Sequence, residues 1–183
     1  TGRLDVFFCG QDTHDRRHKA IEAAQTSARP ERRRVVATRE FLADGSKGGL
    51  DRGEYALMMA ETKFAPCPSG PESPDSFRLY EALEAGAIPI ADEVTPRGAM
   101  PGYWDFVFGG PVPFPVMPGD WRGLAAVIQP IAERSWTERA SRIHAWWLQF
   151  KRRLAYQLVD AVHELAGTAP EHVTPDEQIT VLI

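Results

Sequence analysis

The sequence predicts an α/β fold, a three-layer Rossmann-like domain with a mainly parallel β-sheet. Two short apolar runs, Lys63–Cys67 and Ala87–Ala91, have the length and composition of buried strands. The segment between them ends in a stretch with helical spacing, so this unit consists of strand, loop, helix and strand. A second strand–turn–helix start lies between Leu4 and Ala28. Because such crossovers are right-handed and place the helix on the sheet, we expect neighbouring parallel strands.

The first part of the chain supplies two further strands and two helices. We expect a strand at Leu4–Cys9, a turn at Gly10–Thr13, a helix at His14–Ala28, a short strand at Val35–Ala37 and a helix at Asp51–Thr62. Between the last two elements, residues 41–53 are rich in glycine and are predicted to form a loop on the ligand side of the sheet.

His14 and His18 stand four residues apart at the start of the first helix, a spacing that suits a metal ion. The sequence offers no third ligand in a matching pattern, so they are predicted to be surface histidines. Arg16 and Arg17 lie in the same first turn. On spacing alone they are either a solvated basic face or part of a ligand site.

The central unit has clear boundaries. Residues 68–75 contain three prolines, a glycine and two serines, as is typical of a loop. The helix at Ser76–Ala85 has one apolar face, and Gly86 is expected to end it. Ser73, Asp75 and Ser76 are alternative N-caps.

The loop after Cys67 is expected at the carboxyl ends of the strands, where open α/β sheets bind ligands. The helix after it points its free N–H groups and its positive dipole end at the same place, and such a terminus binds phosphate. Arg78 lies in the first turn of that helix and Glu81 follows three residues later. This spacing is compatible with a surface ion pair. It is also compatible with an arginine that binds a phosphate and a glutamate that binds sugar hydroxyls.

The central unit resembles the donor-binding segment of exostosin-like glycosyltransferases, a family with the GT-B fold. The resemblance covers roughly Tyr55–Asp92 and is weaker at Asp5–Arg17. The residues that carry it are Lys63-Phe64, Cys67-Pro68, Gly70, Ser76, Arg78-Leu79, Glu81-Ala82-Leu83, Gly86 and Ile88-Pro89-Ile90.

This resemblance implies roles for individual residues in nucleotide-sugar binding. Glu81 would hold the ribose of the nucleotide, while Arg78 and the backbone near Ser76 and Phe77 would hold the diphosphate. The resemblance also brings the turn after the first strand, with Gly10, Arg16 and Arg17, near the donor phosphates. No catalytic residue can be assigned from these motifs.

The function implied is transfer of a sugar from a nucleotide-sugar, a UDP-sugar in our interpretation, to an unknown acceptor. No cofactor is expected, and the absence of an Asp-x-Asp motif indicates that no metal is required. A GT-B site lies between two domains, so an N-terminal acceptor domain or a partner chain is expected as well. The alternative is a non-catalytic module that is derived from such a domain and binds a nucleotide or a protein.

Length and composition agree with one domain. The chain has 183 residues and a formal net charge of −4, which gives no general affinity for nucleic acid or anionic membranes. No apolar run has the length of a membrane span, the two cysteines are expected to be free thiols, and a cytoplasmic location is the default expectation. We predict a nucleotide-sugar-binding domain at residues 1–167 and a C-terminal tail at residues 168–183.

The region after Asp92 alternates irregular and regular segments. We expect an irregular stretch to Trp104, a short strand at Asp105–Phe108, an extended run at Val112–Val116 near the sheet edge and a helix at Trp121–Ile131. A long helix follows, with Ser135 as its cap. Its aromatic face, with Trp146, Trp147 and Phe150, is predicted to pack within the domain or to meet the missing half.

Overall fold

The computed structural model describes residues 3–38, 49–134 and 136–167. The chain divides into two compact units, Thr1–His144 and Ala145–Ile183, which are described separately below. Most of the predicted glycine-rich loop, the predicted cap Ser135 and the predicted tail of residues 168–183 lie outside the described residues.

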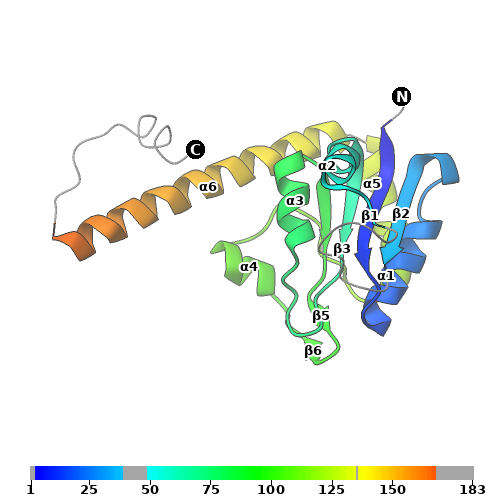
Figure 1. The fold of residues 1–183 in the computed structure, drawn as a ribbon, viewed down its shortest axis with the longest axis horizontal. Helices are drawn as coiled ribbons and strands as arrows, with labels where there is room; N and C mark the ends of the chain where they lie inside the picture. The colour runs from blue at the N-terminus through cyan, green and yellow to red at the C-terminus, as the bar shows by residue number, and fades with distance from the viewer. Residues whose placement is uncertain (1–2, 39–48, 135, 168–183) are drawn as a thin grey trace. The chain divides into compact units, whose positions relative to one another are not determined.

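The first unit is built on a four-stranded parallel sheet (Figure 1). Its strands are β1 (Leu4–Gln11), β2 (Arg33–Thr38), β3 (Thr62–Cys67) and β4 (Ile88–Ala91), in the order β2-β1-β3-β4. All three pairings are parallel. The four strands predicted before Asp92 and the predicted parallel sheet are therefore confirmed.

Helices cover both faces of this sheet. Helix α1 (Asp15–Thr26) packs with α5 (Leu124–Arg134) on one face, and α2 (Arg52–Ala60) packs with α3 (Phe77–Ala85) on the other (Figure 1). Short 3₁₀ turns η1 (Pro30–Arg32) and η2 (Trp121–Gly123) precede β2 and α5. The predicted three-layer Rossmann-like arrangement is confirmed.

The strands are apolar along their length because helices cover both faces of the sheet. Phe7 and Phe8 are consecutive in β1, so their side chains point to opposite faces of the sheet, and both are fully buried. Leu79 and Leu83 of α3 and Ile21 of α1 are buried against the two faces. Burial of each such side chain stabilises the fold by about 1.5–3 kcal/mol.

The end of α3 follows the prediction closely. Gly86 adopts a left-handed conformation with φ of 74°, and its N–H bonds back to the last turn of the helix. Since this conformation is unfavourable for side chains with a Cβ atom, Gly86 stops the helix and directs the chain into β4.

One predicted strand is wrong. Residues 105–108 belong to a short helix, α4 (Tyr103–Phe108), rather than to a strand. A strand would place Phe106 on the same face as Trp104 and Phe108, yet Phe106 is 86% exposed while the other two are buried. Trp104 and Phe108 pack on Phe114, with ring centroids 6.3 and 5.9 Å away, which favours a helical turn.

Small elements extend the sheet region beyond β4. Strands β5 (Val94–Thr95) and β6 (Gly98–Ala99) form a two-residue hairpin ladder. Val116 forms a parallel bridge with Ala91, since the Ala91 N–H donates to Pro115 O and the Met117 N–H donates to Ala91 O, both at 2.9 Å. The predicted position of the extended run at the sheet edge is confirmed.

Helix α6 (Trp136–Ala166) confirms the predicted long C-terminal helix. In the second unit, the Phe150 ring stacks with Trp146 and Trp147 at centroid distances of 6.0 and 5.7 Å. Further along the helix, four apolar side chains are exposed: Leu154, Leu158, Val162 and Leu165. The predicted meeting of this face with another half stays a prediction. Among the described helices, none has the length and apolar character that crossing a membrane needs.

Candidate functional site

The order of the strands defines where a ligand fits. From β1 the chain crosses to β2 on one side, and from β3 it crosses to β4 on the other, so β1 and β3 form a topological switch point. Ligands of open α/β sheets bind outside the carboxyl ends of the strands at such a point. Here those ends are Cys9–Gln11 of β1 and Cys67 of β3.

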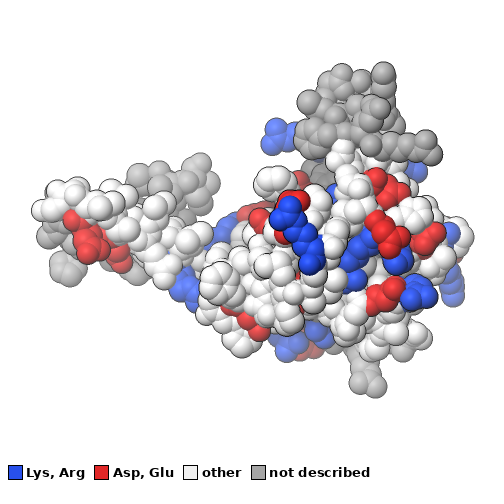
Figure 2. Space-filling view, turned by 90° about the horizontal axis from the view of Figure 1, so that it is seen from below, with Lys and Arg blue, Asp and Glu red and all other residues white. Residues whose placement is uncertain are grey.

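Figure 2 shows the molecule from this end of the sheet. Basic and acidic side chains are interspersed over the visible face, and neither sign forms one continuous patch. A charged ligand at this end would therefore meet individual side chains rather than a broad surface of one sign.

Arg78 is the most unusual of these side chains. Only 9% of its surface is exposed. Its Nε and Nη2 atoms donate hydrogen bonds to the backbone oxygen of Cys9 at 3.1 and 2.5 Å, and its guanidinium lies 4.4 Å from the centre of the Phe8 ring. Its Nη1 atom is buried and has no hydrogen-bond partner. The alternative of a surface pair with Glu81 is wrong, because Arg78 is turned inward across the switch point.

Gly10 makes this position of Arg78 possible. A Cβ atom on Gly10 would lie 2.0 Å from Arg78 Nη2 and 3.1 Å from its Cζ atom. No side chain fits there while the guanidinium stays in place. Gly10, which the resemblance placed near the donor phosphates, thus supports the site by leaving room for a cation.

Arg17 brings a second cation to the same place. Its Nη1 atom reaches Gln11 O at 3.5 Å, and its buried Nε atom has no partner. Burial, together with the charge of Arg78, lowers the pKa of Arg17 to about 10. In the described part of the chain, neither guanidinium makes an ion pair with a carboxylate. Two neighbouring cations with unpartnered N–H groups favour an anionic ligand.

The N-terminus of α3 adds donors beside Arg78. Ser76 is the N-cap, which decides among the three predicted alternatives, and its side chain makes no capping hydrogen bond. Phe77 is the first helical residue, and its side chain is exposed. The Leu79 N–H donates to Ser76 O at 2.9 Å. Without a side-chain cap, the N–H groups of Phe77 and Arg78 are the ones that an anion can use.

Glu81 lies one turn further along α3, on an exposed part of the helix. Its Oε2 atom accepts a hydrogen bond of 2.5 Å from the hydroxyl of Tyr55 in α2. Helices α2 and α3 thus hold the Glu81 carboxylate and the Tyr55 hydroxyl together.

Arg16 is engaged differently from Arg17. Its Nε and Nη2 atoms bind the carboxylate of Asp92 at 2.5–3.0 Å, and Nη2 also donates to Gly119 O at 2.7 Å. Its predicted contact with a nucleotide stays a prediction, although most of its donors are already used within the fold.

Asp92 is a structural centre that sequence reasoning did not single out. It is fully buried directly after β4, where it also accepts hydrogen bonds from Trp121 Nε1 at 2.8 Å and from Val94 N at 3.0 Å. The only signal in the sequence is an acidic residue next to a buried strand. Because Arg16 and Trp121 lie 76 and 29 residues away along the chain, these two partners become visible only in three dimensions.

His14 is part of the fold rather than a surface histidine, so that prediction is wrong for this residue. It is the N-cap of α1, where Nδ1 accepts a hydrogen bond from Arg17 N at 3.4 Å, and Nε2 then donates to Ser69 O at 3.2 Å. His14 therefore ties the first turn of α1 to the loop after β3. His18 is exposed and pairs with Asp12 at 2.7 Å, as expected of a surface residue.

The two histidines are expected to titrate on opposite sides of the ordinary value near 6.5. Burial lowers the pKa of His14, whereas the hydrogen bond to Asp12 raises the pKa of His18. The unfolded chain therefore binds a proton at His14 more readily, and the stability linked to His14 is present above pH 6.5 and lost as the pH falls through the lowered value. For His18 the linked stability is present below pH 6.5 and lost as the pH rises through the raised value.

Long-range ¹H–¹⁵N NMR spectra across a pH titration measure both values and the tautomer of each ring. The variants His14→Asn and His18→Gln assign the signals. We expect the Nε2–H tautomer for His14, because a backbone N–H donates to its Nδ1 atom. A His14 midpoint at or above that of His18 would contradict this geometry.

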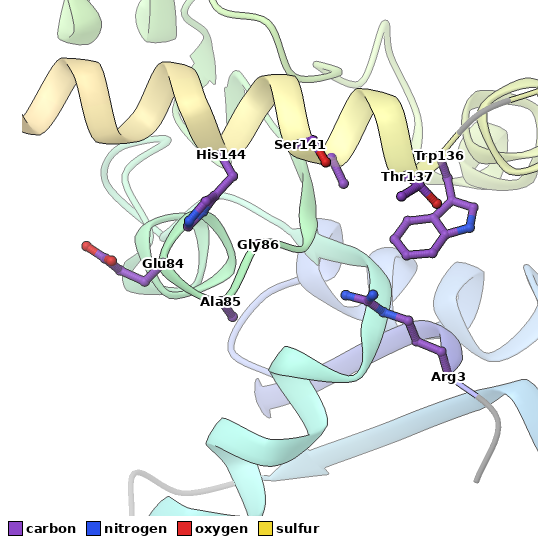
Figure 3. A pocket seen from close by; sticks show the side chains of 9 residues that line it. Arg3, Glu84, Ala85, Gly86, Trp136, Thr137, Ser141 and His144 are labelled. Atoms are coloured by element: carbon purple, nitrogen blue, oxygen red, sulfur yellow. The ribbon is translucent and has the colours of Figure 1, made fainter.

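A separate pocket of about 350 Å³ lies at the other end of the sheet (Figure 3). Arg3, which precedes β1, and Gly86, which precedes β4, line it together with Ser141 and His144 of α6. The Arg3 guanidinium stacks 4.5 Å from the centre of the Trp136 ring. Since this pocket is at the amino ends of the strands, it is not part of the switch-point site.

Comparison with known proteins gives a family for this chain. Residues 18–165 match the family described as the RXYLT1 C-terminal domain. The chain belongs to this family. The matched range holds Arg78, Glu81 and Asp92, and it starts just after Arg17.

The chain is similar to ribitol-5-phosphate xylosyltransferase 1 from Danio rerio. It is 24% identical over 118 residues, which are 61% of this chain and 27% of the relative. The chain thus spans about a quarter of that protein's length. The two comparisons support the predicted relation to glycosyltransferases.

Proposed function

We propose that this domain binds the nucleotide-sugar donor of a glycosyltransferase. In this proposal it is the donor-binding half of an enzyme with the exostosin-like GT-B architecture. The observation that carries the proposal is Arg78, a buried cation with an unpartnered Nη1 atom beside Arg17 at the switch point. An anion bound there relieves the repulsion between two guanidiniums and satisfies their buried donors.

The donor diphosphate fits the chemistry of this site. Arg78, Arg17 and the open first turn of α3 offer charged and backbone donors, which suit phosphate oxygens. In a sugar transfer, the diphosphate leaves with a growing negative charge. Donors fixed in advance at that position stabilise the charge, and we propose that they do so without a metal ion. Glu81 takes the ribose in this proposal.

A UDP-sugar is the proposed donor. The name of the Danio rerio relative describes a xylosyltransferase. For this reason UDP-xylose is the first nucleotide-sugar to test with this chain, followed by other UDP-sugars and GDP-sugars. The acceptor stays unknown.

Calorimetric titration of the chain with UDP in excess chelator tests the binding proposal. UDP is expected to bind, and Arg78→Ala is expected to weaken UDP binding by at least tenfold, about 1.4 kcal/mol, while uridine binding changes less. The reason is that a hydrogen bond to a charged group contributes about 1.5–3 kcal/mol when its partner is buried.

Arg97→Ala is the matched control for this experiment. Arg97 is an exposed arginine of the β5–β6 turn that pairs with Glu72 at 2.6 Å, so its loss removes one positive charge without touching the switch point. We expect wild-type affinity from this variant. Equal losses in the two variants, or binding that strictly requires a divalent metal, would overturn the proposed role of Arg78.

The second candidate function is a non-catalytic module that keeps the donor site. The observation in its favour is that the assigned residues account for donor binding only, and none of them selects or deprotonates an acceptor. We expect this chain to bind UDP without transferring a sugar, because the acceptor half of a GT-B site comes from another domain. Turnover of a labelled UDP-sugar by a protein that contains both halves separates an enzyme from a binding module.

A further inference from the structure

Tyr55 and Glu81 form a closely coupled pair at the edge of the switch-point site. The Tyr55 hydroxyl of α2 donates to Glu81 Oε2 of α3 at 2.5 Å, and the two residues are 26 positions apart in sequence. The Tyr55 ring packs on Phe7 of β1, with ring centroids 5.5 Å apart. The Tyr55 ring thus packs on the sheet, while the Tyr55 hydroxyl binds the Glu81 carboxylate of the neighbouring helix α3.

The Tyr55 hydroxyl stays protonated over the ordinary pH range. Burial raises the pKa of the Tyr55 phenol well above its usual value, and the bond to Glu81 acts in the same direction. Tyr55 therefore remains a hydrogen-bond donor, and Glu81 receives the bond as an acceptor.

The N-terminus of helix α2 fixes the position of Tyr55. Asp51 and Glu54 form a capping box at its N-terminus, in which the Asp51 side chain accepts from Glu54 N at 2.9 Å. This fixes the first turn of α2, where Tyr55 lies, before any ligand is present.

We propose that Tyr55 is a positioning residue that orients the Glu81 carboxylate to accept the two hydroxyls of a nucleotide ribose. This inference rests on the proposed function, since it assumes that a nucleotide diphosphate binds at the switch point. An ionised carboxylate has about four acceptor sites, and the Tyr55 hydroxyl occupies one of them on Oε2. The sites that remain on both oxygens suit the paired hydroxyls of a ribose.

Such an arrangement selects ribonucleotides over deoxyribonucleotides. A carboxylate that is held in one rotamer gains the full benefit of two ribose hydrogen bonds, because the side chain is already ordered. A carboxylate that is free to rotate pays its ordering entropy on binding. Loss of the Tyr55 hydroxyl should therefore reduce the preference for ribose rather than weaken phosphate binding.

Calorimetric affinities of UDP and 2′-deoxy-UDP for four proteins test this inference: wild type, Tyr55→Phe, Glu81→Gln and the double variant. We expect the wild type to prefer UDP by about tenfold, the gain from one hydrogen bond to a charged group. Tyr55→Phe should reduce that preference about threefold or more, with 2′-deoxy-UDP binding nearly unchanged. In the double variant, Tyr55→Phe should have no effect beyond that of Glu81→Gln, because the two residues act as one unit.

Tyr80→Phe is the matched control. It removes a hydroxyl from a tyrosine of the same helix, next to Glu81 in sequence, that interacts with Asp75 instead. Wild-type selectivity is expected from it. Circular dichroism of each variant confirms that the helices are retained.

The outcomes separate this inference from the proposed function. If the wild type binds neither UDP nor 2′-deoxy-UDP, both the proposed function and this inference are overturned. If the wild type prefers UDP and Tyr55→Phe keeps the full preference, only the role of Tyr55 is overturned. Equal weakening of both nucleotides by Tyr55→Phe also overturns it, because that result indicates a purely structural role.

Discussion

Replacing Gly10 by alanine is expected to remove most of the affinity for a nucleotide diphosphate while the domain stays folded. The new methyl group would lie 2.0 Å from Arg78 Nη2, so the guanidinium must leave its place over Phe8 and Cys9. The atom displaced is the far end of a flexible side chain, and the sheet itself need not move. Loss of charged hydrogen bonds of about 1.5–3 kcal/mol corresponds to a fall in affinity of about 10- to 150-fold.

The measurement is UDP affinity by calorimetry, with a thermal melt to confirm folding. Gly123→Ala is the control, because a Cβ atom there meets only Met117 Cε at 3.9 Å, an ordinary contact. In an Arg78→Ala background, Gly10→Ala should cause no further loss, since both changes act on the same guanidinium. Wild-type affinity for Gly10→Ala, or additive losses, would show that Gly10 does not act through Arg78.

Replacing Asp92 by alanine is expected to cause the largest loss of stability. This carboxylate is fully buried, and it holds the Arg16 guanidinium and the Trp121 indole N–H. Without it, one charge and several buried donors lose their partner, which costs about 3–5 kcal/mol. That is a large part of the 5–15 kcal/mol by which domains are usually stable. Asp92→Asn should also destabilise the fold, because its amide N–H₂ would face other donors.

Urea denaturation gives the free energy of unfolding for each variant. Asp15→Asn is the control, since Asp15 is an exposed aspartate of the same region that forms a surface pair with Lys19. This exposed pair is expected to contribute little. If Asp92→Ala unfolds no more easily than Asp15→Asn, Asp92 does not hold the end of β4 in the way that its contacts indicate.

The elements of this domain could be predicted from the sequence where a local pattern has only one good solution. A short apolar run before Pro68 forms β3, and Gly86 ends α3 because only glycine readily takes the left-handed conformation there. The parallel order of the strands followed from the handedness of the crossovers. The prediction failed where the pattern was ambiguous. In α4, Trp104 and Phe108 are four residues apart, so they share one face in a strand and in a helix alike. Their packing on Phe114 favoured the helix.

The candidate site was only partly predictable. The resemblance pointed to Arg78 and Glu81. The position of the loop directly after the strand that ends at Cys67 pointed to the carboxyl end of the sheet. Their environment was not visible in the sequence, because the Arg78 guanidinium binds an oxygen 69 residues away and Arg16 binds a carboxylate 76 residues away. Spacing within one helix suggested an Arg78–Glu81 pair, yet each side chain found a partner on another element.

For this protein, the sequence by itself determined the strand–loop–helix–strand unit and the edge of the sheet at which a ligand fits. These depend on periodicity, on turn residues and on the handedness of the chain, which are local properties. Only the tertiary structure decided which cations remain unpartnered, that Gly10 makes room for Arg78, and that Tyr55 holds Glu81. Those facts depend on which distant segments meet, because hydrogen bonds and steric contacts act over a few ångströms in space regardless of distance along the chain.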